Sequence, residues 1–72
     1  MEYKDIKLTT EAIKLAQFLK HVDAVSSGGQ VKHFLEEGLV RVNGVTERRR
    51  GRKLIAGDLV EIDGAISFRV RT

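Results

Sequence analysis

The stretch that decides the fold is Val40-Arg41-Val42-Asn43-Gly44-Val45-Thr46-Glu47-Arg48. An Asn-Gly pair between two short runs rich in β-branched residues is the strongest short-range signal for a β-hairpin with a two-residue turn. That turn pairs Val42 with Val45 and leaves Val40 opposite Glu47. Since side chains alternate along a strand, we expect one face in the core and one exposed. The core face carries Val40, Val42 and Val45, and the exposed face carries Arg41, Thr46 and Arg48.

Two further strand signals follow the hairpin. Lys53-Leu54-Ile55 indicates a short strand that ends at a turn over residues 56–58. Leu59–Ile62 and Ile66–Val70 then predict a second hairpin around Asp63-Gly64-Ala65. A three-residue loop puts four apolar side chains on one face, whereas a two-residue loop mixes them with polar ones. We therefore expect two apolar pairs, Ile62 with Ile66 and Val60 with Phe68.

Before the first hairpin, the pattern predicts a short strand and two helices. Residues 3–8 alternate weakly and indicate the strand. Apolar residues at helical spacing predict a helix within residues 11–22, with Thr9 or Thr10 as its cap and Glu11 in its first turn. A second helix is expected from about Gly29 to Glu37, ended by Gly38.

Composition excludes several classes of protein. Seventy-two residues make one domain, here residues 1–72, with a small core. The absence of cysteine excludes disulfides and thiolate zinc sites and suits a reducing cytoplasm. His21 and His33 are a poor basis for a metal site, and no apolar run is long enough to span a membrane. With no catalytic constellation and no cofactor motif, we expect neither an enzyme nor a small-molecule substrate, and we expect a monomer.

The charge is distributed unevenly along the chain. The net charge is +3, from 13 basic and 10 acidic residues. Residues 1–40 carry five lysines against six acids, whereas residues 41–72 carry seven arginines and one lysine against four acids. Arginine is well suited to phosphate oxygens because its guanidinium donates several hydrogen bonds in one plane. The densest run therefore predicts an RNA contact, although a solvated loop explains it as well: Arg48, Arg49, Arg50, Arg52 and Lys53.

The start of the second helix is a candidate phosphate site. Ser27-Gly28-Gly29 presents unobstructed backbone N–H groups, where the helix dipole favours an anion. Lys32 in the first turn opposes that dipole by roughly 0.3–1 kcal/mol, and a bound phosphate would remove the conflict. The alternative is that Lys32 pairs with Glu36 one turn later.

If the helices pack on the sheet, the arginine-rich run and the start of the second helix would form one basic patch with Lys14 and Lys20. The expected core positions of Phe18, Phe34 and Phe68 leave no aromatic platform for unpaired bases. We therefore expect the binding partner to be structured RNA, which the protein recognises by its shape and by the positions of its phosphates. A protein-interaction adaptor of β-grasp-like character remains the alternative. Duplex DNA is disfavoured, because the exposed positions of the second helix include Glu36 and Glu37.

The ordered motifs resemble the S4 (S-four) RNA-binding domain, also called the alpha-L motif. Val40-Arg41-Val42-Asn43-Gly44 matches the strongest motif of that family, and residues 14–19, 31–38, 53–54 and 57–60 are similar to its remaining elements. The resemblance spans about residues 14–63. The loops of this chain look most like those of short stand-alone bacterial members, some of which are linked to ribosome assembly.

The resemblance implies an α+β fold, with a two-helix αα-hairpin packed on a small antiparallel β-sheet. It also implies a non-catalytic protein that binds structured RNA, such as ribosomal RNA, across the helices and the first hairpin. Carried over by position, the contacts include Lys14, Lys32, Arg41 and the turn residue Asn43. Ala16 and Gly28-Gly29 depart from the family pattern, which leaves more of the contact to backbone N–H groups.

Overall fold

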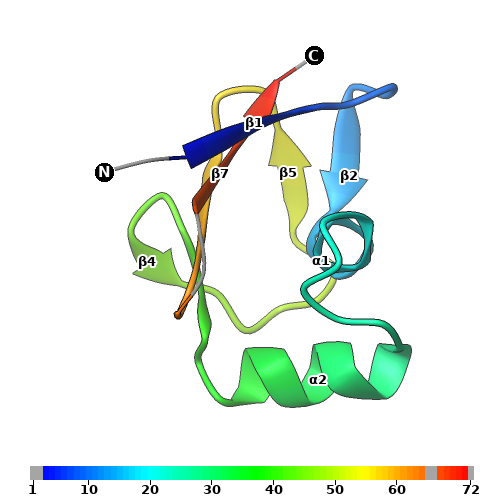
Figure 1. Cartoon of the computed structure of the whole chain (residues 1–72), viewed down its shortest axis with the longest axis vertical. Helices are drawn as coiled ribbons and strands as arrows, with labels where there is room; N and C mark the ends of the chain where they lie inside the picture. The colour runs from blue at the N-terminus through cyan, green and yellow to red at the C-terminus, as the bar shows by residue number, and fades with distance from the viewer. Residues whose placement is uncertain (1–2, 65–66, 72) are drawn as a thin grey trace.

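The computed structural model describes residues 3–64 and 67–71, which form two helices and seven strands (Figure 1). The mixed α+β class expected from the sequence is confirmed, and so are the bounds of the second helix to within one residue at each end. The elements in chain order are β1 (Tyr3–Lys7), β2 (Ala12–Lys14), α1 (Leu15–His21), α2 (Gly28–Glu36), β3 (Val40–Val42), β4 (Val45–Thr46), β5 (Lys53–Ile55), β6 (Leu59–Ile62) and β7 (Ser67–Arg71).

The strands form a five-stranded sheet in the order β1-β7-β6-β3-β4 and a separate pair, β2-β5. The β3–β4 hairpin has the predicted register, with Val42 opposite Val45, and Asn43 and Gly44 both adopt positive φ. The predicted pairing of Val60 with Phe68 is confirmed, whereas Ile66 and Ala65 lie outside the described residues. The sheet is antiparallel except at one edge, where β1 lies parallel to β7. The expected antiparallel sheet is therefore confirmed for every described strand pairing except β1 with β7.

The core lies between the larger sheet on one side and α1, α2 and the β2–β5 pair on the other (Figure 1). The rings of Phe18 and Phe68 meet edge to face, with their centroids 5.9 Å apart, and join α1 to β7. Val40 and Val42 are buried as predicted, but Val45 is 69% exposed. Strand β4 is only two residues long and forms the edge of the sheet, so no element covers Val45 on the core face. Phe34, expected in the core, is only partly buried.

The first helix begins later than the sequence predicts. Residues 12–14 form β2 against β5, and α1 starts at Leu15 with Lys14 at its N-cap, so neither Thr9 nor Thr10 caps it. Glu11 consequently lies outside the helix. The physical reason is that the first two helical N–H groups find acceptors in a distant loop rather than in the preceding turn.

Helix α2 ends at the predicted glycine. Gly38 has φ +71°, its N–H donates to the carbonyl of Leu35 at 3.1 Å, and the next N–H reaches the carbonyl of Phe34 at 3.4 Å. This left-handed C-terminal turn favours glycine because a side chain is strained there. A Cβ at this position would also lie 3.0 Å from a guanidinium nitrogen of Arg48. Gly38 thus ends the helix and leaves room for the arginine.

Candidate nucleic-acid interface

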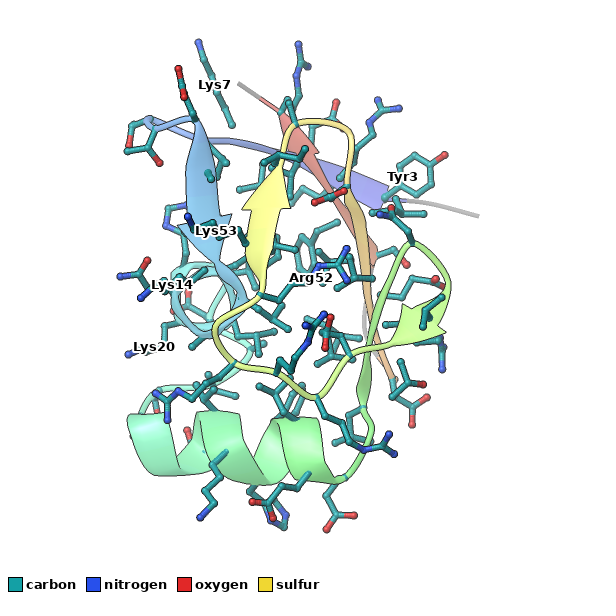
Figure 2. All side chains as sticks on the ribbon, turned by 180° about the vertical axis from the view of Figure 1, so that it is seen from behind. Tyr3, Lys7, Lys14, Lys20, Arg52 and Lys53 are labelled. Atoms are coloured by element: carbon teal, nitrogen blue, oxygen red, sulfur yellow. The ribbon has the colours of Figure 1, made fainter. Side chains whose placement is uncertain are left out.

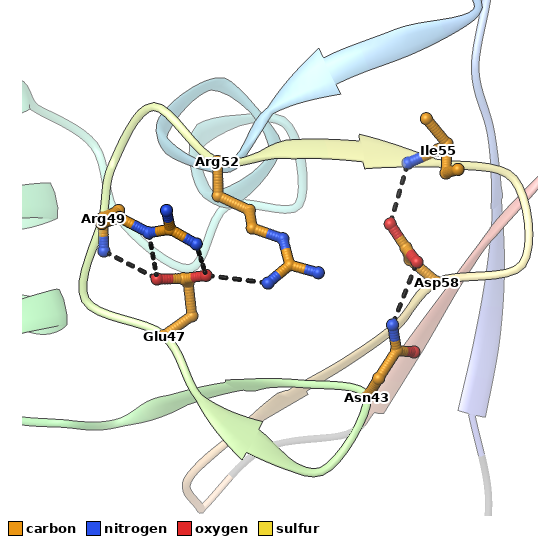
Figure 3. A network of polar contacts seen from close by, with 6 residues as sticks. All are labelled: Asn43, Glu47, Arg49, Arg52, Ile55 and Asp58. Atoms are coloured by element: carbon orange, nitrogen blue, oxygen red, sulfur yellow. Dashed lines mark hydrogen bonds and ion pairs between the residues drawn. The ribbon is translucent and has the colours of Figure 1, made fainter.

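The arginine loop, residues 48–52, is held by one buried carboxylate. Glu47 is only 7% exposed, and its two oxygens accept four hydrogen bonds (Figure 3). Arg49 donates from its backbone N, its Nε and its Nη2 at 3.1–3.2 Å, and Arg52 donates from Nη1 at 2.9 Å. Hydrogen bonds to charged groups are stronger than neutral ones. Glu47 therefore fixes the loop and neutralises part of its charge.

Glu47 is not among the functional residues predicted from the sequence, although its position in the hairpin register is a signal. In the predicted hairpin register Glu47 lies opposite Val40, which is a core position, and the N–H of Glu47 indeed donates to the carbonyl of Val40 at 2.9 Å. A buried acid needs a cationic or hydrogen-bonding partner. The four arginines that follow it supply two such partners.

The backbone of the same loop caps the N-terminus of α1. The N–H of Leu15 donates to the carbonyl of Arg52 at 2.7 Å, and the N–H of Ala16 donates to the carbonyl of Arg50 at 3.0 Å. These carbonyls satisfy two of the N–H groups that every helix start leaves without an intrahelical partner. The loop backbone is thus fixed at one end by Glu47 and at the other by α1, which limits where its side chains can project.

Two lysines lie directly opposite each other beside this loop. Lys14 on β2 pairs in register with Lys53 on β5, and both are exposed. With Ala12, Ile13 and Gln17 they line a groove of about 300 Å³, which we call the lysine groove. Figure 2 shows Lys14, Lys20 and Lys53 projecting on the same side of the molecule. Like charges facing each other across strands are destabilising, and a bound polyanion would relieve that cost.

Asn43 has a structural role in the hairpin turn. Its Nδ2 donates to Asp58 Oδ1 at 3.0 Å (Figure 3). Its Oδ1 accepts the N–H of Leu59 at 2.9 Å. The other oxygen of Asp58 accepts the N–H of Ile55 at 2.9 Å. The side chain that the sequence offers as an RNA contact therefore ties the first hairpin to the turn between β5 and β6.

The start of α2 is capped by Ser27, and Lys32, one turn farther along the helix, has a carboxylate partner. The Ser27 side chain accepts the N–H of Gln30 at 3.3 Å, and a Cβ on Gly28 would lie 3.9 Å from a guanidinium nitrogen of Arg50. Arg50 therefore lies next to this helix start. Lys32 contacts Glu36 at 4.0 Å, which is the alternative pairing expected from the sequence. Both side chains are largely exposed, so the contact contributes little stability.

The predicted contacts thus lie at four places in the structure. Lys14, Lys20 and Lys53 lie on one side of the molecule, and Arg50 joins the arginine loop to the start of α2. Arg41 points to the face of the sheet away from the core, because it alternates with Val40 and Val42. Arg48 lies by Gly38, at the other end of α2. The structure therefore does not bring all the predicted residues together in one patch.

A second hollow of the described part of the chain lies away from the lysine groove. This hollow, of about 510 Å³, lies between the α1–α2 connection and α2, has Val25 and Phe34 among its lining and contains no lysine or arginine. Among residues 3–64 and 67–71, no group of three or more potential metal ligands lies together. No helix in these ranges is both long and apolar enough to cross a membrane.

The Glu47 contacts predict how stability depends on pH. Hydrogen bonds from Arg49 and Arg52 lower the pKa of Glu47 from 4.5 to about 2, against an opposing effect of burial. A carboxyl group whose pKa is lowered by folding stabilises the fold above its unfolded pKa. We expect the free energy of unfolding to fall as the pH decreases from about 4.5 to about 2. Urea unfolding at pH 7, 5 and 3 measures this, and equal stability at pH 3 and 7 would contradict it.

Comparison with known proteins places the chain in a family. The model of a family described as S4 domain matches residues 6–71. A protein of Bacillus subtilis (strain 168), named "Probable ribosome maturation protein RlbA", is 54% identical over 65 residues, which cover 90% of this chain and 92% of the relative. The match includes both hairpins, the two helices and the arginine loop. The resemblance found in the sequence is confirmed, and this chain belongs to the S4 domain family.

Proposed function

We propose that this protein is a non-catalytic module that binds structured RNA, and that this RNA belongs to the ribosome or to one of its precursors. The observation that carries the proposal is the pair of lysines facing each other across the lysine groove, Lys14 and Lys53. A fold gains nothing by placing two exposed ammonium groups opposite each other, whereas the phosphate backbone of RNA needs closely spaced cations. The name of the Bacillus relative, which refers to ribosome maturation, supports the choice of RNA.

We assign the RNA contact to the side of the molecule that joins β2, β5, α1 and the start of α2. Lys14, Lys20, Lys53 and Arg50 supply the cations, and Ser27, Gly28 and Gly29 supply backbone N–H groups. Lys32, Arg49 and Arg52 are secondary contacts, because each also contacts a carboxylate of the protein. Asn43 acts through the hairpin it holds in place. We take α1 and α2 as the two helices of the alpha-L motif.

Binding to a labelled RNA stem-loop across a series of salt concentrations tests this function. If four phosphates are neutralised, the affinity should fall roughly 100-fold between about 50 and 200 mM salt, because counterions are released on binding. A DNA duplex of the same length should compete poorly, since RNA and DNA differ in groove shape and in the 2′-hydroxyl. Absence of binding at low salt would refute the proposal. Salt-insensitive binding to a protein partner would favour an adaptor instead.

A further inference from the structure

A second pair of neighbouring cations lies at the edge of the larger sheet. Strand β1 runs parallel to β7, and its register puts Lys7 beside Arg71, with Asp5 beside Arg69. Paired residues of neighbouring strands point to the same face, so all four side chains lie together. Three cations and one carboxylate therefore share this face, and we call this group the β1–β7 patch.

Within the β1–β7 patch, Asp5 holds one arginine firmly and the other loosely. Arg69 donates to it from Nε at 3.0 Å and lies over the Tyr3 ring, 5.5 Å from the ring centroid. Arg71 makes one contact, from Nη1 at 3.3 Å, and its side chain is 60% exposed. Among the described residues, Lys7 has no carboxylate within 4.0 Å. Lys7 and Arg71 therefore keep donors available for an external anion, while Arg69 positions Asp5.

The β1–β7 patch lies on the same side of the molecule as the lysine groove (Figure 2). The N–H of Leu8, which follows β1, donates to the carbonyl of Arg71 at 2.7 Å. The turn after β5 is joined to β7 by the N–H of Gly57, which donates to the carbonyl of Val70 at 2.8 Å. Figure 2 shows Lys7, Lys53, Lys14 and Lys20 along one side of the molecule. Lys14 and Lys53 face each other at the far end of the β2–β5 pair from the turn after β5. The two cation pairs, Lys7 with Arg71 and Lys14 with Lys53, are therefore spaced along one side of the molecule (Figure 2).

We infer that the RNA surface continues from the lysine groove onto the β1–β7 patch, where Lys7 and Arg71 bind phosphates farther along the same RNA. The inference rests on the proposed function. Its basis is that two cations lie opposite each other on neighbouring strands at two places on one side of the molecule, and that Asp5 offsets the repulsion only in part at the second. One run of phosphate backbone that passes over both places satisfies both pairs at once.

The test compares the RNA affinity of protein variants on stems of two lengths. Binding of the full chain is measured to one stem longer than 28 Å, the longest extent of the protein, and to one about half that length. Lys7→Gln with Arg71→Gln should weaken binding to the long stem roughly tenfold and reduce the salt slope by about two, as expected for two lost phosphate contacts. On the short stem the same variant should bind nearly as well as the wild type.

Matched variants separate this inference from a general loss of charge. Lys4→Gln removes an exposed lysine from the same strand, where alternation directs it to the other face, and should change affinity little. Lys7→Arg with Arg71→Lys keeps both charges and should retain the wild-type affinity, which also controls for folding. Wild-type affinity of the neutralised variant on the long stem, together with a weakened Lys14→Gln/Lys53→Gln variant, would overturn the extension and leave the proposed function standing. Absence of RNA binding by the wild type would overturn both.

Discussion

Replacing Glu47 with glutamine is expected to lower the free energy of unfolding by about 2 kcal/mol, which is a large loss for a domain of this size. The carboxylate is buried and accepts four hydrogen bonds from Arg49 and Arg52. Glutamine offers one acceptor oxygen and places an NH₂ donor against a guanidinium. The loss stays below that of a fully buried ion pair, because the Arg49 side chain is 77% exposed.

Thermal and urea unfolding measure this effect, and the melting temperature should decrease by roughly 10 °C. Glu36→Gln is the matched control, since Glu36 is an exposed carboxylate whose contact with Lys32 at 4.0 Å contributes only a few tenths of a kcal/mol. The Glu47→Gln variant should also lose most of the decrease in stability between about pH 4.5 and 2. Equal melting temperatures for Glu47→Gln and Glu36→Gln would show that Glu47 does not hold the loop.

Neutralising both lysines of the groove should have opposite effects on binding and on stability. With Lys14→Gln and Lys53→Gln together, RNA affinity at about 100 mM salt should fall at least tenfold, and the salt slope should decrease by about two. Stability should stay equal to that of the wild type or rise by a few tenths of a kcal/mol, because the facing ammonium groups no longer repel each other. A purely structural pair would show the reverse, with lower stability and unchanged binding.

Salt titrations and urea unfolding of the same protein preparation give both measurements. Lys14→Arg with Lys53→Arg retains the charges and should bind RNA within a few-fold of the wild type. The Lys4→Gln variant again controls for net charge alone. Unchanged affinity in the doubly neutralised protein would move the RNA contact away from the lysine groove, toward Arg41 and the exposed face of the sheet.

Local patterns predicted the parts of the fold that depend on neighbouring residues. The Asn-Gly turn gave the β3–β4 register, alternation gave the buried Val40 and Val42, and Gly38 gave the end of α2. These predictions succeeded because turn geometry and helix termination are decided by a few consecutive residues. The prediction that Val45 is buried was wrong, because alternation gives the face of a strand but not how far the core extends over that face.

Of the candidate site, the sequence supplied the residue types but not their partners. It indicated a basic loop and lysines near α1, yet it did not show that Glu47 binds Arg49 and Arg52 or that Asn43 is bound to Asp58. The two latter residues are 15 positions apart, so their contact depends on how the β5–β6 turn docks on the hairpin. Hydrogen bonds within the fold thus show that some residues predicted to contact RNA hold the structure of the loop or the hairpin instead.

By itself, the sequence determined the α+β class, the first hairpin with its register, the second helix and the family, because each depends on short-range spacing and turn chemistry. Only the tertiary structure decided where α1 begins and which cations face each other. Both outcomes arise from pairing between distant segments: β2 with β5, which places Lys14 opposite Lys53, and β1 with β7, which places Lys7 beside Arg71. Such pairing is stabilised by the shared core and by long-range backbone hydrogen bonds, which no local pattern encodes.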